Sequence, residues 1–177
     1  MIPPALPSPV RKTWAELLAL PPADADLARL YEVWNAHRGS AATPDRARIR
    51  PEEFAFILGR VNVVDVNPGA PRYTFRIFGT QIGRYRDLQL TGRSTEPLQP
   101  RAYRDLIEAH YEAAHAAQAP TLHEVYITNG TVVRKYRRLI VPYATESHPA
   151  GMLVTGTFFP ESLKDVVQSS AFLRDDD

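Results

Sequence analysis

The chain has 177 residues, of which 44% are hydrophobic and 23% charged, a composition typical of a globular protein with one sizeable core. Lys and Arg number 21 against 20 Asp and Glu, so the net charge of +1 provides no global field for nucleic acid or an acidic membrane surface. The absence of cysteine excludes disulfides, thiolate metal sites and cysteine nucleophiles. The near-neutral charge also leads us to expect no nucleic-acid partner. Because no secretion signal or membrane-spanning stretch is evident, we expect a cytoplasmic protein without a membrane span.

The first part of the sequence predicts a tail followed by helices. Residues 1–23 begin with a Pro-rich stretch, and residues 10–20 have the spacing of a short helix that ends at Pro21 and Pro22. From Asp24, a good N-cap, apolar residues at helical spacing predict a helix to about residue 37. A second short helix is expected to begin at Pro51 and end at Gly59.

These N-terminal helices offer an apolar stripe through which we expect a homodimer to form. Its residues are Trp14, Leu17, Leu18, Leu27, Leu30, Tyr31 and Trp34.

The rest of the chain predicts a mostly antiparallel β-structure. Residues 61–66 and 72–78 alternate like strands on either side of a Pro- and Gly-rich turn, and residues 80–101 are irregular. A long amphipathic helix is expected over residues 103–117. Three strands follow, over residues 122–128, 132–143 and 152–159, and the first two are joined at an Asn-Gly turn. Residues 161–173 again show helical spacing.

This element order predicts one topology. The last three strands form a meander, and the first hairpin joins it only if its opening strand pairs with the final strand. The expected fold is α+β: a five-stranded antiparallel sheet of order 2-1-5-4-3 with helices on one face, an N-terminal helical extension and a C-terminal helix. The domain boundaries follow as residues 1–23 for the tail and short helix, 24–160 for the main domain with its helical cap, and 161–177 for the C-terminal helix and acidic tail.

Several local strings occur in an order that carries a family resemblance across about residues 27–163. They are Leu30-Tyr31 with Trp34, Arg38-Gly39, Pro44, Arg46, Ile49 with Pro51, Val63-Val64-Asp65, Phe75 to Thr80, Leu90 to Arg93, and Leu139 to Pro142. In this order they resemble the stand-alone, single-domain PAS proteins of alphaproteobacteria, although the family has a shorter approach to the Thr91-Gly92 pair. The resemblance implies a sensory or regulatory domain that signals through a partner protein. We expect it to bind a small molecule, such as a small apolar ligand, a partner protein, or both in signal transduction, without catalysis.

His110 is the most informative single residue, because it lies on the apolar face of the long helix, where a PAS ligand pocket would lie. It could contact a ligand or haem iron, although a lone histidine on such a face is more often a packed core residue. The candidate pocket residues are Phe78, Tyr85, Ile107, His110, Tyr111, Tyr126, Thr155 and Thr157.

Covalent flavin and coumarate photochemistry both need a cysteine and are therefore excluded. Haem and noncovalent flavin stay open, with no sequence feature in favour of either. No metal site is expected, since His110 and His115 are five residues apart and lie on different helix faces.

The basic run from Arg134 to Arg138 suggests nucleic-acid binding at first sight. On a strand, however, these residues alternate between faces, and we expect the arginines to pair with carboxylates such as Glu124. His123 and Glu124 are expected at the surface.

Asp65 and Arg76 are expected to form a structural pair. One alternative function is a small cone-shaped α+β enzyme of the cyclase or isomerase type, with His110, Asp65 and Tyr111 as acid–base candidates. Another is an interaction scaffold without a ligand.

Overall fold

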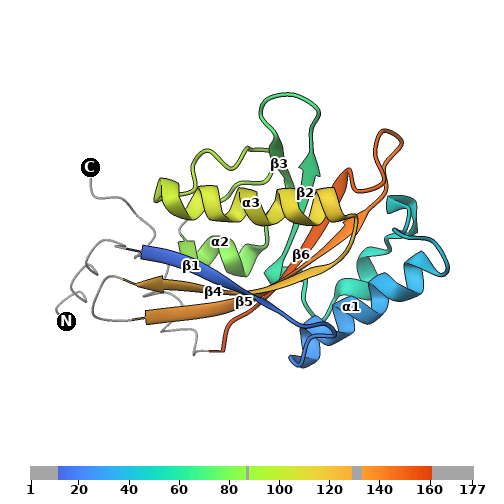
Figure 1. The fold of residues 1–177 in the computed structure, drawn as a ribbon, viewed down its shortest axis with the longest axis horizontal. Coiled ribbons are helices and arrows are strands. Elements are labelled where there is room, and N and C mark those ends of the chain that lie inside the picture. The colour runs from blue at the N-terminus through green and yellow to red at the C-terminus, as the bar shows by residue number, and fades with distance from the viewer. Residues whose placement is uncertain (1–11, 87, 129–132, 161–177) are drawn as a thin grey trace.

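The computed structural model describes residues 12–86, 88–128 and 133–160, which form one six-stranded antiparallel sheet with helices on both faces (Figure 1). The strands are β1 (Lys12–Leu18), β2 (Val61–Val66), β3 (Tyr73–Ile77), β4 (Thr121–Thr128), β5 (Val133–Tyr143) and β6 (Met152–Phe158). Their order across the sheet is β1-β4-β5-β6-β2-β3. The last five, from β4 to β3, have the order expected from the sequence, so that prediction is confirmed.

Three hydrogen-bonded ladders fix the order from β4 to β2. β5 pairs with both β4 and β6 to form the predicted meander, and β2 pairs with β6 through the register Val64 to Leu153. The hairpin of β2 and β3 carries a register shift between Val63 and Val64. Because antiparallel partners point to the same face, this register decides which side chains meet on each side of the sheet.

The predicted helix over residues 10–20 is wrong, because Lys12–Leu18 forms the edge strand β1, paired with β4. The apolar residues Trp14 and Leu17 fit a helical spacing, but the free edge of β4 supplies backbone partners that a short isolated helix lacks. The rings of Trp14 and Tyr126 stack in this pairing, with centroids 5.0 Å apart and an interplanar angle of 3°. Tertiary pairing therefore determines the local structure.

The main helices are α1 (Ala25–Arg38), α2 (Thr80–Arg86) and α3 (Arg101–Ala117). Figure 1 shows α3 running across the sheet with α1 on the side away from it. The expectation of helices on one face alone is thus corrected: α1 packs on the second face, against β5 and β6. We call the α3 side of the sheet the inner face and the α1 side the outer face.

Each face has its own apolar core. On the inner face, α3 covers Val64, Phe75, Val125, Ile140 and Leu153. On the outer face, the core contains Leu27, Leu30 and Trp34 of α1, packed on alternate residues of the same strands.

The outer core corrects part of the expected dimer stripe. Leu27 and Leu30 are fully buried and Trp34 nearly so, and the indole nitrogen of Trp34 donates to the carbonyl of Pro142 at 2.7 Å. These three residues pack within their own chain and offer no surface to a second copy. Leu17 of the edge strand is by contrast 72% exposed.

The remaining helical expectations have mixed outcomes. The short helix expected at Pro51 is two separate 3-10 turns, Pro51–Phe54 and Leu58–Arg60. The Asn129-Gly130 turn and the C-terminal helix expected after residue 160 lie outside the described residues. Within the described ranges, no helix has the length and apolar character needed to cross a membrane.

Candidate functional site

A row of polar side chains crosses the inner face beneath α3. His123 of β4 is paired in register with Arg138 of β5, and Arg138 is paired with Thr157 of β6. All three are buried, with at most 8% of their surface exposed. The surrounding inner core is apolar, so this row places a cation and an imidazole where the fold otherwise buries hydrocarbon.

His110 covers this row from α3. Its ring stacks on the ring of His123, with centroids 3.7 Å apart and an interplanar angle of 8°. Its Nδ1 atom lies 2.7 Å from Nη2 of Arg138. Since a guanidinium nitrogen can only donate, Nδ1 of His110 is the acceptor and its proton is on Nε2. The contact thus fixes His110 as a neutral imidazole. We call His110, His123 and Arg138 the inner cluster.

Arg138 is the charged member of the inner cluster and has no carboxylate partner in the described part of the chain. Its exposed fraction is 4%. Besides His110, it lies 3.5 Å from the hydroxyl of Tyr136, and its guanidinium is 5.7 Å from the ring of Tyr111. Because arginine stays protonated in proteins, the inner cluster holds a full positive charge with no carboxylate beside it among the described residues.

Three buried polar atoms near this charge have no hydrogen-bond partner among the described residues. They are Nε of Arg138, Nδ1 of His123 and Oγ1 of Thr155. Thr155 is fully buried and shares the inner face, two residues along β6 from Thr157. Buried polar atoms are normally satisfied in folded proteins, so these atoms, together with the likewise unpaired Oγ1 of Thr121 opposite Ile140, mark a place on the inner face where a further polar group would be stabilising.

The electrostatics of the inner cluster keep both histidines neutral. Burial, followed by the charge of Arg138 and by His123, lowers the pKa of His110 to about 2. Burial and the charge of Arg138 lower the pKa of His123 to about 4. At neutral pH the cluster therefore carries one positive charge, on Arg138 alone.

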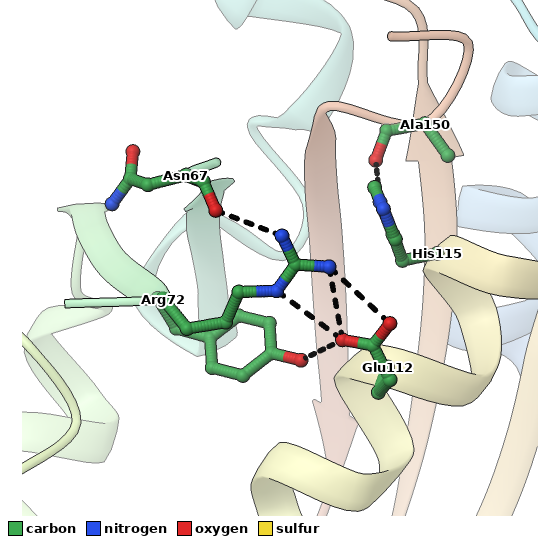
Figure 2. Close-up of polar contacts among 6 residues, drawn as sticks. Asn67, Arg72, Glu112, His115 and Ala150 are labelled. Carbon is green, nitrogen blue, oxygen red and sulfur yellow. Dashed lines mark hydrogen bonds and ion pairs between the residues drawn. The ribbon is translucent and has the colours of Figure 1, made fainter. Parts of the chain in front are cut away.

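The C-terminal half of α3 is held to the sheet by a second set of contacts, which Figure 2 shows. Glu112 accepts from Arg72 at 3.1 Å and from the hydroxyl of Tyr73 at 2.6 Å, while Nδ1 of His115 lies 2.8 Å from the carbonyl of Ala150. The hydrogen bond from Tyr73 and the charge of Arg72 lower the pKa of Glu112. We call these contacts the α3 clasp; they position His110, two residues before Glu112, over the sheet.

Most of the predicted pocket residues lie on the inner face. Phe78, Ile107 and Tyr111 are part of the inner core, and Thr155 and Thr157 lie beside Arg138. The prediction that Tyr126 lines the pocket is wrong, because its neighbours Val125 and Ile127 are the residues that point inward. The hydroxyl of Tyr126 lies 2.6 Å from Glu124, and its ring stacks on Trp14. Tyr85 belongs to α2, but its side chain lies outside the described part of the structure.

The basic strand β5 is divided between the two faces as alternation predicts. Arg137 pairs with Glu124 at 2.7 Å and with Asp24 at 2.9 Å, as expected, whereas the expectation is wrong for Arg138, which has no carboxylate partner among the described residues. The placement of His123 and Glu124 at the surface is wrong, because His123 is 8% and Glu124 6% exposed. The signal that could have identified the inner cluster is periodicity: Arg138 lies two residues from Ile140, and His123 two from Val125, both inward positions.

The acid–base pair of the enzyme alternative, His110 and Asp65, is not brought together in the structure. Asp65 follows the inward-pointing Val64 and pairs with Arg76 at 3.0 Å on the other side of the strand, as expected for a structural pair. His110 lies on the inner face, so the sheet separates the two groups. Among the described residues, no group of three or more His, Asp or Glu side chains is arranged to hold a metal ion.

Comparison with known proteins identifies the family. The family model described as a PAS domain matches residues 23–158, which include the sheet from β2 to β6, α1 and the inner cluster. No curated protein matches the sequence significantly. A solved structure of an RNA-binding light-oxygen-voltage receptor is similar with a TM-score of 0.46 and 12% identity, over 93% of this chain but only 43% of the receptor chain. The chain belongs to the PAS domain family.

Proposed function

We propose that this PAS domain is a cytoplasmic sensory or regulatory module that binds a small molecule at the inner cluster and relays binding to a partner, without catalysis. The observation that supports this most directly is the buried Arg138, which has no carboxylate partner in the described residues and an unpaired Nε atom. A buried charge of this kind is retained where it has a task, since well-packed apolar residues in its place are often as stable or more stable.

The register of the sheet supplies a route for the relay. Leu17 of β1 is the cross-strand partner of His123, so the edge strand lies directly beside the inner cluster. A ligand that moves His123 or His110 would favour one arrangement of β1 and α3 over another, and the shift in population would be the signal.

Dimerisation remains part of the proposal, now centred on β1. An edge strand presents backbone groups that a second chain can pair with, and Leu17 adds an exposed apolar side chain. We further propose that nucleic acid is not a partner, because Arg137 and Lys135 of the basic strand contact Glu124. Native mass measurement with and without the Leu17→Asp substitution tests the dimer: a dimer that this substitution disrupts supports β1, and a monomeric parent chain contradicts the prediction.

Ligand binding is tested by NMR on the ¹⁵N-labelled full chain. Mixtures of small metabolites are added, and backbone amide shifts are mapped onto the structure. We expect at least one mixture to shift resonances of His110, His123 and Thr155 saturably, with the exposed outer-face residue Arg76 unaffected. If no mixture perturbs the inner face while a partner protein binds the surface, the interaction-scaffold alternative is correct and the ligand-binding proposal fails.

A further inference from the structure

The inner cluster also indicates the chemical class of its ligand, an inference that rests on the proposed function. We propose that the ligand is a small apolar monocarboxylate and that its carboxylate binds the guanidinium of Arg138. The unbalanced charge of Arg138 favours an anion. Arg138 is 4% exposed and is in contact with an imidazole and phenols, but with no carboxylate among the described residues. A bound anion would supply the missing negative charge in a water-poor site, where charge-assisted hydrogen bonds are strong.

The hydrogen-bonding groups that lack a partner among the described residues also favour an anion. Nε of Arg138 is a donor only, and the hydroxyl of Thr155 can donate as well. Nδ1 of His123 donates in one of the two neutral tautomers. Three unpaired groups that can all donate match the acceptor-only oxygens of a carboxylate. An amine offers the opposite chemistry, and a neutral amide supplies only one acceptor oxygen.

The neutral histidines of the inner cluster limit the charge of the ligand to one. Both histidines of the inner cluster stay neutral, because burial and Arg138 lower the pKa of His110 to about 2 and that of His123 to about 4. One guanidinium balances one negative charge. A phosphate dianion would leave a net negative charge in the same buried place, which is as unfavourable as the present net positive charge.

The body of the ligand is indicated by the side chains that enclose the guanidinium. Tyr103 and Tyr136 join their hydroxyls at 2.6 Å, Tyr111 lies beside Arg138, and Ile107 packs in the same core. All four are at most 8% exposed. An aromatic or branched aliphatic body would therefore pack against rings and methyl groups, while only its carboxylate would need polar partners.

The test compares matched pairs of probes on the full chain by NMR. Benzoate and isobutyrate are titrated against benzamide and isobutyramide, which have nearly the same shape without the charge. We expect the carboxylates to shift the inner-face resonances saturably and to bind at least about 30-fold more tightly than the amides. Arg138→Met should reduce benzoate affinity by at least about 30-fold, whereas Arg76→Met, the same exchange on the outer face, should leave it within about threefold.

Each other outcome overturns the inference in a distinct way. If amides bind the inner face as tightly as carboxylates, the ligand is neutral and the anion inference fails while the proposed function stands. If sodium chloride produces the same shifts as benzoate, the response is one of ionic strength and the inference fails. If neither these probes nor the metabolite mixtures perturb the inner face, both proposals fail. If Arg138→Met does not fold, the ligand class is decided by comparing benzoate with benzamide on the parent chain and by measuring benzoate affinity of Arg138→Lys.

Discussion

Lowering the pH from 7 to 5 should lower the unfolding free energy of this protein. The substitution His123→Phe should make this loss of stability smaller. In the folded state burial and Arg138 lower the pKa of His123 from 6.5 to about 4. Below pH 6.5 the unfolded chain therefore binds a proton that the folded chain does not. The stability contributed by the neutral imidazole is complete above about pH 6.5 and is lost as the pH falls towards 4.

The magnitude follows from the difference between the two pKa values. A pH of 5 is 1.5 units below the pKa of 6.5 that His123 has in the unfolded chain, whereas in the folded chain His123 is still neutral at this pH. The preferential protonation of the unfolded chain lowers the unfolding free energy by about 2 kcal/mol. His110, with its pKa lowered to about 2, contributes a similar loss that is present in both proteins. Phenylalanine keeps an aromatic ring for the stack on His110 but cannot be protonated.

Urea unfolding of the parent chain and of His123→Phe, each at pH 7 and pH 5, measures the effect. The parent chain should lose about 2 kcal/mol more than the variant between the two pH values. Comparing each protein with itself cancels any packing change that the substitution causes. Equal losses would mean that His123 is protonated in the folded state or exposed to water, and would refute the electrostatic description of the inner cluster.

Three further substitutions test other contacts. Arg138→Met should raise the unfolding free energy by about 1–4 kcal/mol in urea titrations, because it removes a buried charge that has no carboxylate partner in the described part of the chain; a loss of stability would mean that the charge is compensated. The neighbouring Arg137→Met should instead lower it by about 3 kcal/mol, since it leaves the buried Glu124 without its closest cation, and an unchanged value would show that this pair is not stabilising. Glu112→Ala should lower it by about 1–2 kcal/mol and speed amide exchange in the C-terminal half of α3; uniform exchange along α3 would argue against the α3 clasp.

The sheet could be predicted from the sequence because its strands alternate clearly and because connection rules allow few orders. The β2–β6 pairing is a long-range feature, yet it follows once the meander and the first hairpin are recognised. β1 could not be predicted in this way. Its seven residues have apolar positions that suit either periodicity, and only the free edge of β4 makes the strand favourable.

Only part of the site could be predicted, because the positions of its other residues also depend on how the strands pair. His110 was identifiable as a polar residue on the apolar face of a helix, and it lies in the inner cluster. His123 was expected at the surface and Arg138 in an ion pair with a carboxylate, because both residue types are usually exposed or paired. The decision between the faces of β5 depends on its register against β4 and β6, which places Arg138 inward and Arg137 outward. That register results from the pairing of the three strands and cannot be read from the residues of β5 alone.

The central claim, that Arg138 is the anion-binding group of this PAS domain, is tested most directly by the Nε–H signal of its guanidinium in a ¹H–¹⁵N spectrum. During a benzoate titration this signal should move saturably to lower field, as expected when an unpaired donor gains a carboxylate acceptor. The corresponding signal of Arg76, which is already paired with Asp65, should not move. An Arg138 signal that stays constant while benzoate shifts other resonances would contradict the claim.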